Sequence, residues 1–313
     1  NSRTAQDLSM NIVLIGIGII AIAMWLIPAI PVNLIGAIII VICGFFFATV
    51  SSRMVGIVGS SNNPVSGMAI ATLLIATMLL KASGMIGYPG MVSAIAIGTV
   101  ICIIAAVAGD TSQDLKTGYI IGATPKKQQI GELIGVVVSA LAIGGILYLF
   151  NNAWSYGTPE LPAPQAMLMK MVVEGVMGGN LPWNLVFVGV GIAIVVEILG
   201  IPVLPFAVGL YLPIYLSTPM MVGGAVRWFF ERKGDNKEGI DRGVLYCSGL
   251  IAGEGLVGIL LAVFAVIKAG GTSLGDIIGS CLPFSLGNWG GLVIFAALTA
   301  TLFAVVSKKS KKN

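Results

Sequence analysis

GSSNNPVSG, residues 59–67, separates two apolar stretches that are each close to the length needed to cross a lipid bilayer. Backbone that cannot form a regular helix is tolerated at membrane depth only where it is buried in protein or lines a water-filled cavity. Polar breaks of this kind usually mark a path for a substrate. The stretch therefore predicts a membrane protein of packed helices with a polar interruption between two of them.

Composition assigns the broad class of the protein. Of the 313 residues, 57% are hydrophobic and 10% are charged, and the mean hydropathy is +1.00, so there is too little polar surface for a soluble globule. Several apolar stretches approach the roughly 20 residues that a spanning helix needs. We expect an all-α polytopic membrane protein in contact with the lipid bilayer, and no nucleic-acid partner.

Eight apolar stretches are predicted to span the membrane. They cover residues 10–30, 34–50, 67–83, 88–108, 130–150, 181–199, 243–267 and 290–306. The stretch 201–230 is different, because four prolines divide it into pieces that we expect to be too short to cross alone. It predicts two half-helices or a re-entrant hairpin, and the prolines are Pro202, Pro205, Pro213 and Pro219.

The stretches suggest one transmembrane domain over residues 1–313. Its predicted parts are a first helical hairpin (10–50), two spans with the polar breaks (51–129), two spans with an outer interfacial helix near 164–179 (130–199), the broken hairpin (200–232), the last two spans (243–306) and a basic cytoplasmic tail (307–313). The chain begins at Asn1 without an initiating Met. This start could belong to a disordered leader, or equally the chain could be the second part of a longer protein.

Lysine and arginine concentrate in cytoplasmic loops of membrane proteins, and their distribution predicts the topology. Counting crossings from an inside Arg3 leaves only Lys81, Lys170 and Lys268 on the outer side. The count requires that the stretch 201–230 enter and leave by the same face or cross twice. Both termini are then predicted to be cytoplasmic.

Histidine is absent, so any proton-coupled chemistry must fall to carboxylates. The four cysteines show neither metal-site nor disulfide spacing, and no nucleophile–base pair is recognisable. We therefore expect no enzymatic activity, no bound metal and no cofactor. Glu254 lies mid-span, where a carboxylate costs about 2.5–3.5 kcal/mol. It is either a functional group or a carboxylate satisfied inside the protein, whereas Glu197 and Glu132 lie near span ends and are expected to reach headgroup water.

A second polar stretch, GDTSQDLKTGY, covers residues 109–119 in a predicted inner connection. Asp110 and Asp114 are four residues apart and would share one helical face, and Asp110 could cap the turn that follows. Lys116 could pair with either carboxylate. We expect a solvated loop, or a loop that folds back into the protein as part of a site.

Ordered motifs in this sequence carry a resemblance to a known family. They are SSNNPVSGM (60–68), AGDTSQDLKTGY (108–119), GATPKKQQ (122–129), LPAPQA (161–166), LPW (181–183), VGLYLP (208–213), RGVL (242–245) and SGLIAGE (248–254). These resemble the signatures of the prokaryotic branch of the oligopeptide transporter family, to which yellow-stripe-like metal-chelate carriers are related. The match corresponds to the C-terminal part of family members. It implies a secondary transporter of peptides or metal chelates, typically driven by protons, in the prokaryotic cytoplasmic membrane.

Discontinuous helices of secondary transporters bind cargo through their termini and unwound backbone, and asparagine side chains suit an amide-bearing ligand. Proline can begin a helix without losing a hydrogen bond. The predicted substrate-binding residues are Ser60, Ser61, Asn62, Asn63, Pro64 and Gln113, and the predicted proton-coupling residues are Asp110, Asp114, Glu254 and Glu197.

Two other functions are left open by the residues. One is a channel, and the other is a structural subunit that completes a path formed by a missing N-terminal half; a homo-oligomer is also left open. Channels usually assemble rings around short filter loops, and no repeated filter-like run is present in the sequence.

Single cysteines introduced directly after Lys126 and at Thr158 test the predicted topology, because the two positions are expected on opposite sides of the membrane. A membrane-impermeant maleimide added to intact cells should label only the second. Equal labelling from outside would contradict the predicted topology.

Overall fold

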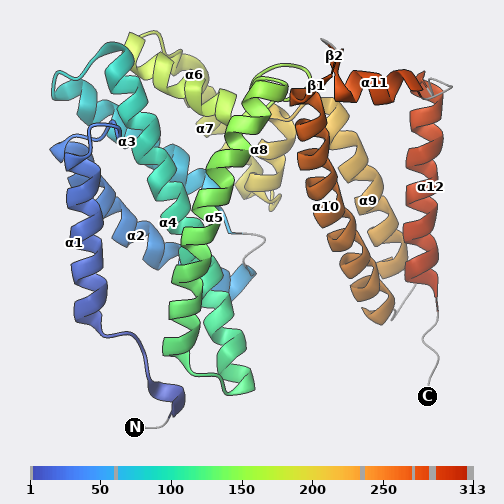
Figure 1. The fold of residues 1–313 in the computed structure, drawn as a ribbon, viewed down its shortest axis with the longest axis horizontal. Helices are drawn as coiled ribbons and strands as arrows, with labels where there is room; N and C mark the ends of the chain where they lie inside the picture. Colours follow the sequence, from blue (N-terminus) through green and yellow to red (C-terminus); the bar gives the residue numbers. More distant parts are fainter. Residues whose placement is uncertain (1–2, 60–62, 233–236, 270–271, 282–286, 309–313) are drawn as a thin grey trace. The chain divides into compact units, whose positions relative to one another are not determined.

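The structure is a computed structural model that describes residues 3–59, 63–232, 237–269, 272–281 and 287–308 (Figure 1). Its architecture is all-α apart from one short antiparallel pair of strands, as the sequence predicts. The chain divides into two compact units. Unit 1 comprises Asn1–Leu141 with Ala163–Leu204, and unit 2 comprises Ala142–Pro162 with Pro205–Asn313.

Unit 1 holds the N-terminal helices. A short 3-10 turn, η1 (Arg3–Ala5), precedes them. They are α1 (Met10–Leu26), α2 (Leu34–Val58), α3 (Val65–Ala82), α4 (Gly87–Ile121), α6 (Pro164–Gly178) and α7 (Trp183–Ile198). The long helix α5 (Pro125–Ala153) begins in unit 1 and ends in unit 2.

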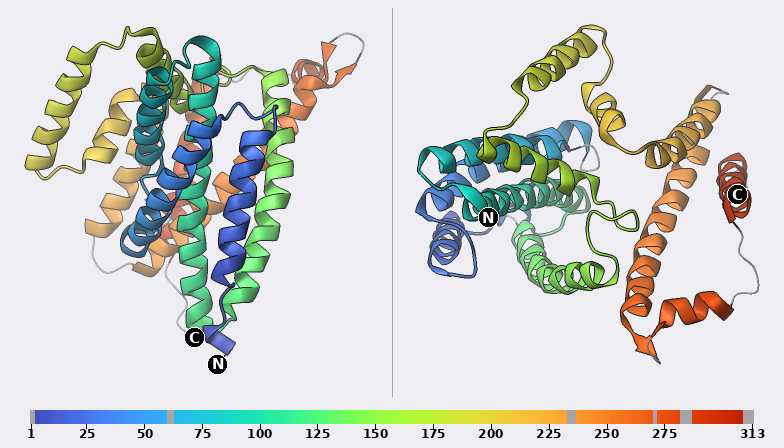
Figure 2. Two further views of the ribbon diagram at one scale, coloured as in Figure 1. Left: turned by 90° about the vertical axis from the view of Figure 1, so that its left-hand side faces the viewer. Right: turned by 90° about the horizontal axis from the view of Figure 1, so that it is seen from above.

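The core of unit 1 lies where α2 and α3 pack on α4, and α6 covers α3 and α4 (Figures 1 and 2). Gly36 of α2 faces Ile97 of α4, and Val55 faces Gly109, so α2 and α4 run in the same direction. Leu73 of α3 and Ile97 of α4 are almost fully buried in this core. Burying side chains of this size is worth about 1.5–3 kcal/mol each relative to water.

Local signals in the sequence explain several helix ends. The Asn33 side chain accepts a hydrogen bond from the Gly36 N–H at 2.8 Å and so caps α2. α4 ends where Gly122 takes a left-handed conformation with φ of +75°, which glycine adopts without strain. The predicted helix near 164–179 is confirmed as α6, and Lys170 pairs with Glu174 at 3.8 Å on its exposed side.

Unit 2 holds the C-terminal helices. They are α8 (Val203–Tyr211), which begins at the end of unit 1, then α9 (Ile214–Arg232), α10 (Lys237–Val266), α11 (Leu274–Cys281) and α12 (Gly287–Ser307). The strands β1 (Lys268–Ala269) and β2 (Thr272–Ser273) connect α10 to α11. α10 packs on α9 and α12, and the hydroxyls of Tyr246 and Thr301 lie 2.9 Å apart between α10 and α12.

Most of the predicted spans are confirmed as helices. Among the described residues, seven helices are long and apolar enough to cross a membrane, and each corresponds to a predicted span. The remaining predicted span, 181–199, is the 16-residue helix α7 and is shorter than expected. α2 extends eight residues beyond its predicted end, to Val58, because Ser51 and Ser52 make hydrogen bonds to α4 instead of ending the helix.

The expectation that four prolines cut the stretch 201–230 into short pieces is wrong for Pro205, which lies in the first turn of α8, and for Pro219. The segment does form a pair of helices, α8 and α9, with Pro213 between them. Pro219, however, lies inside the 19-residue α9. Proline removes one helical hydrogen bond, but transmembrane helices tolerate it where neighbouring groups satisfy the freed carbonyl. The strands and α11 were not predicted, because their segments are too short for a periodic signal.

Gly98 provides a test of packing between α3 and α4. A Cβ at Gly98 would lie 2.8 Å from Cδ1 of the buried Leu73, so Gly98→Ala forces the core apart. We expect a loss of about 1–3 kcal/mol, measured as a lower thermal unfolding midpoint in detergent. The control is Gly135→Ala on α5, where nothing lies within 4 Å and the midpoint should stay or rise. Equal midpoints for the two variants would contradict this packing.

Candidate functional site

The predicted polar break between two helices is confirmed. α2 ends at Val58, and α3 begins at Val65 with Pro64 as its N-cap residue. Gly59 ends α2 with φ of +82°, a conformation that residues other than glycine rarely adopt. The predicted site residues Ser60, Ser61 and Asn62 lie outside the described residues, whereas Asn63 and Pro64 are within them.

Asn63 is held by a chain of hydrogen bonds between helices. Its Nδ2 donates to Ser51 Oγ at 2.6 Å, and Ser51 Oγ donates to the Ala105 carbonyl of α4 at 2.5 Å. Ser51 is completely buried. Two weaker hydrogen bonds continue the link along α2 and α4, from Ser52 Oγ to the Ala108 carbonyl at 3.2 Å and from Ser112 Oγ to the Ser52 carbonyl at 3.3 Å. We call Ser51, Ser52, Asn63, Gly109 and Ser112 the polar strip.

Gly109 allows the strip to form. A Cβ at this position would lie 2.7 Å from Asn63 Nδ2, 2.9 Å from Val55 Cγ2 and 3.1 Å from Ser51 Oγ. Any side chain here would therefore displace Asn63 or separate α2 from α4. The Oδ1 atom of Asn63 is buried and has no hydrogen-bond partner among the described residues. An acceptor in this position costs about 1–3 kcal/mol until a donor reaches it.

The expectation of a loop at 109–119 is wrong, because these residues form the last turns of the 35-residue α4. Two hydroxyls of this stretch find acceptors while it stays helical: Ser112 Oγ donates to the Ser52 carbonyl of α2, and Thr117 Oγ1 donates to the Gln113 carbonyl of α4 itself. Asp110 is therefore inside the helix and does not cap one. At about 1.5 Å per residue α4 is roughly 52 Å long, which exceeds the roughly 30 Å of membrane hydrocarbon, so its polar end can reach water.

Asp110 and Asp114 lie on one face of α4, as their spacing predicts, and both are exposed. The predicted pairing with Lys116 is absent from the described part of the chain, where the Lys116 ammonium lies 5.3 Å from the centre of the Tyr119 ring instead. Gln113 is also exposed on this end of α4. The structure thus places Asp110 directly after Gly109, which lies against Asn63, and Gln113 and Asp114 about one turn further along α4.

The remaining predicted carboxylates lie elsewhere. Glu197 is exposed in the last turn of α7, consistent with its predicted position near a span end. Glu254 is exposed in the middle of α10, in unit 2, and makes no hydrogen bond or ion pair with any residue that the structure describes. A carboxylate in the middle of an apolar spanning helix is costly without a partner, which keeps Glu254 a candidate for function.

Sequence reasoning missed Ser51, Ser52 and Gly109. The signal for the serines was present, because two adjacent hydroxyls close to the end of an apolar span are unusual, but their bonds to α4 depend on tertiary contacts. Glycine is too frequent in this chain, with 42 residues, for Gly109 to stand out.

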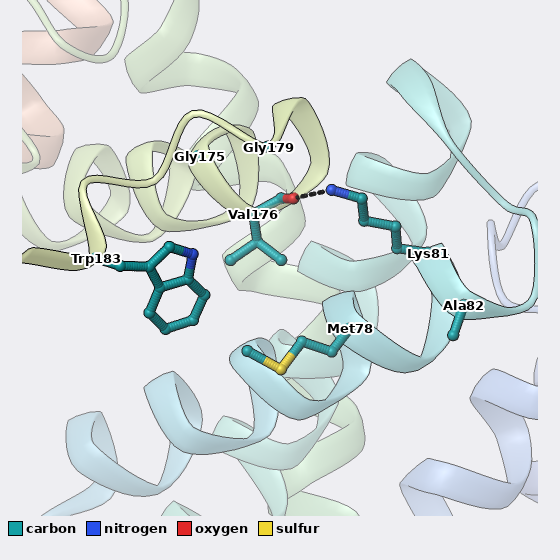
Figure 3. A pocket seen from close by; sticks show the side chains of 7 residues that line it. All are labelled: Met78, Lys81, Ala82, Gly175, Val176, Gly179 and Trp183. Atoms are coloured by element: carbon teal, nitrogen blue, oxygen red, sulfur yellow. Dashed lines mark hydrogen bonds between the residues drawn. The ribbon is translucent and has the colours of Figure 1, made fainter.

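A hollow lies at the opposite end of α3 from the polar strip, about 27 Å away along the helix axis. It has a volume of about 330 Å³ and is lined by residues of α3, α6 and α7 (Figure 3). Lys81 Nζ donates to the Val176 carbonyl at 2.7 Å, and Trp183 faces Lys81 across the hollow. The ammonium thus satisfies a carbonyl in the last turn of α6, where a cation is favourable.

The sequence of the chain matches a family model described as "OPT oligopeptide transporter protein" over residues 1–265. The chain belongs to the oligopeptide transporter family. The "Putative oligopeptide transporter" of Haemophilus influenzae is 31% identical over 312 residues, which cover 87% of this chain and 49% of that protein. The resemblance stated from the motifs is thereby confirmed.

Plant relatives match a shorter part of this family member. A "Probable metal-nicotianamine transporter" of Arabidopsis thaliana is 30% identical over 56% of this chain and 27% of its own length, and one of Oryza sativa subsp. japonica is 29% identical over 58% and 28%. The chain therefore spans about half the length of the Haemophilus protein and less of the plant proteins. No solved structure matches the chain.

A double-mutant cycle of Ser51→Ala and Asn63→Ala tests the polar strip. Ser51→Ala leaves Asn63 Nδ2 without its acceptor and should lower stability by about 1–3 kcal/mol. Asn63→Ala removes a donor to Ser51 Oγ, which keeps its bond to the Ala105 carbonyl, so it should cost less, and the double variant should lose less than the sum. Thermal unfolding in detergent measures both effects. The control Ser280→Ala removes an exposed hydroxyl that bonds only within α11 and should change little. Additive losses would contradict the hydrogen bond between Ser51 and Asn63.

Proposed function

We propose that this chain forms part of a secondary transporter that moves oligopeptides, peptide-like solutes or metal chelates across the membrane in symport with protons. The family supports transport, and the names of the relatives suggest peptides and metal-nicotianamine as cargo classes. Among the structural observations, the proposal depends most on the interruption between α2 and α3, whose described end is anchored to α4 by the polar strip.

An anchored interruption suits cargo binding for a physical reason. α2 ends at Val58 and α3 begins at Val65, and backbone groups between two helices in a membrane need partners in the protein, in water or in a ligand. Asn63 Nδ2 is occupied by Ser51, so we assign Asn63 to positioning the break. Contact with cargo is then proposed for the neighbouring Ser60, Ser61 and Asn62, with Pro64 starting α3.

The exposed face at the end of α4 is the proposed place for coupling. Asp110 and Asp114 are separated by one helical turn, which disfavours two adjacent negative charges by a few tenths of a kcal/mol. A proton or a cationic group of the cargo would relieve this repulsion, since no lysine or arginine among the described residues pairs with either carboxylate. Gln113, between them in sequence, is proposed to contact cargo through its amide.

Uncovered helices support a further part of the proposal, a path completed by additional polypeptide. α5 has no buried residue along its 29 residues, and Glu254 of α10 lacks a described partner. The Haemophilus relative is about twice as long as this chain, so an N-terminal half of the same protein is the proposed partner for these surfaces. Glu254 and Glu197 would then join the proton path from this chain's side.

These same uncovered surfaces favour one alternative, in which the chain is a structural subunit and the path lies in the other half.

The proposed location is the prokaryotic cytoplasmic membrane with both termini inside, in line with the distribution of basic residues.

Uptake of a labelled dipeptide by proteoliposomes containing the full-length protein tests the proposal. An inward proton gradient should accelerate uptake, and Asp110→Asn or Asp114→Asn should reduce the acceleration at least about fivefold by removing a titrating group. The control Glu174→Gln changes an exposed carboxylate that pairs with Lys170, and should leave uptake intact.

Glu254→Gln and Asn63→Ala extend the test to the other proposed roles. Loss of gradient dependence in Glu254→Gln would support a role in coupling, whereas normal uptake in every variant would favour the structural subunit. A rate that ignores the gradient in the unchanged protein would contradict proton symport.

A further inference from the structure

An apolar groove lies between α9, α10 and α12 of unit 2. It has a volume of about 320 Å³, and its walls include Phe230, Cys247, Ile251 and Val306. Its lining residues on α10 recur every three or four positions from Ile240 to Ile251, so the groove follows that helix for about three turns, roughly 16 Å. This length and the apolar lining suit an extended apolar chain.

Close packing closes one side of the groove. A Cβ at Gly243 would lie 2.6 Å from Val306 Cγ2, so α10 and α12 are in contact there. The rings of Phe230 and Phe303 pack at 4.7 Å between centroids and join α9 to α12. Three helices of unit 2 that contact one another therefore form the walls of the groove.

One end of the groove is basic. There α9 ends, α10 begins and α12 ends, and Arg242 Nη2 donates to the Lys308 carbonyl to join two of these ends. The described residues from 227–232, 237–242 and 307–308 carry five basic side chains and three acidic ones. Two of the acidic side chains, Glu231 and Glu238, pair with Arg227 and Arg242. The described part of the rim keeps an excess of positive charge and therefore attracts anions.

Two arginines at this end are arranged as at a membrane–water interface. Arg227 lines the groove, and its Nε donates to Glu231 Oε1 at 2.8 Å while its side chain remains 66% exposed. Arg232 lies 5.2 Å from the centre of the Trp228 ring, which is itself exposed. Tryptophan is enriched at the level of lipid headgroups, and basic pockets between transmembrane helices bind anionic headgroups.

We propose that the groove holds an acyl chain of an anionic phospholipid whose phosphate group is bound at the basic rim, with Arg227 as the principal contact. The apolar walls favour hydrocarbon over water, and the rim selects the charge of the headgroup. The membrane around the protein supplies the ligand. The lipid site uses none of the residues to which a role in cargo binding or proton coupling is assigned, although α10 also carries Glu254.

Cys247 is a free thiol in the groove wall and reports its occupancy. In the full-length protein with Cys247 as the sole cysteine, the rate of maleimide labelling is measured in detergent with added phosphatidylglycerol or phosphatidylcholine. We expect phosphatidylglycerol to slow labelling and phosphatidylcholine to have a much weaker effect. Arg227→Gln should reduce the difference about fivefold, the contribution expected of one arginine, whereas Arg53→Gln on the exposed side of α2 should not.

Filling the groove provides a second test. Gly223 lines the groove, and a Cβ added at Gly223 would have no neighbouring atom within 4 Å, so Gly223→Leu can occupy the space without a clash. Native mass spectrometry should show a retained phosphatidylglycerol in the unchanged protein and in the control Gly249→Leu, and its loss in Gly223→Leu. Size-exclusion chromatography checks that each variant is folded.

Two results would overturn the lipid site. Equal protection of Cys247 by the two lipids would exclude selection by the basic rim. Protection of Cys247 without any added or co-purified lipid would indicate that another segment of polypeptide fills the groove.

Discussion

Polar groups buried in a membrane protein need hydrogen-bond partners, and beside the break between α2 and α3 the Asn63 side chain finds one in Ser51, whose hydroxyl in turn donates to the Ala105 carbonyl of α4. The other features of unit 1 are consistent with this link. Gly109 has no side chain because Asn63 occupies the space, α2 continues to Val58 so that Ser51 can reach α4, and α4 continues past its apolar segment so that Ser112 can bond to α2. The interruption is therefore a packed feature of the fold.

This arrangement separates two kinds of polar group. Asn63 and the serines are turned inward and hold helices together, whereas Asp110 and Asp114 lie exposed on α4 and Glu254 lies exposed on α10. In the proposed transporter, the first kind positions the break and the second kind carries charge. The exposed carboxylate of Glu254 in the middle of α10 is expensive in hydrocarbon, which is why we propose that further polypeptide covers it. The lipid proposed for the groove of unit 2 would satisfy a different surface, one that is apolar along its length and basic at one end.

Much of the fold could be predicted from the sequence, because long apolar stretches and the break at 59–67 depend on local composition. The family was also recognisable from ordered motifs such as AGDTSQDLKTGY. For these same residues the structural expectation was wrong, because a polar stretch after an apolar span suggests a loop. Only the contacts of Ser112 and Gly109 with α2 explain why the stretch stays helical. The expectation was also wrong at Pro219, which lies inside a helix although proline usually ends one. The role of Ser51 could not be predicted, because a buried serine is recognised by its partner and not by its neighbours in sequence.

We propose that transport by the full-length protein requires Asn63 to pack closely against Gly109. Dipeptide uptake by Gly109→Ala in the full-length protein measures this dependence, and the control is Gly56→Ala near the end of α2, where an added Cβ meets nothing within 4 Å. We expect Gly109→Ala to lose most of the uptake while remaining folded and inserted, and Gly56→Ala to keep it. Normal uptake in a folded Gly109→Ala protein would show that transport does not depend on this packing.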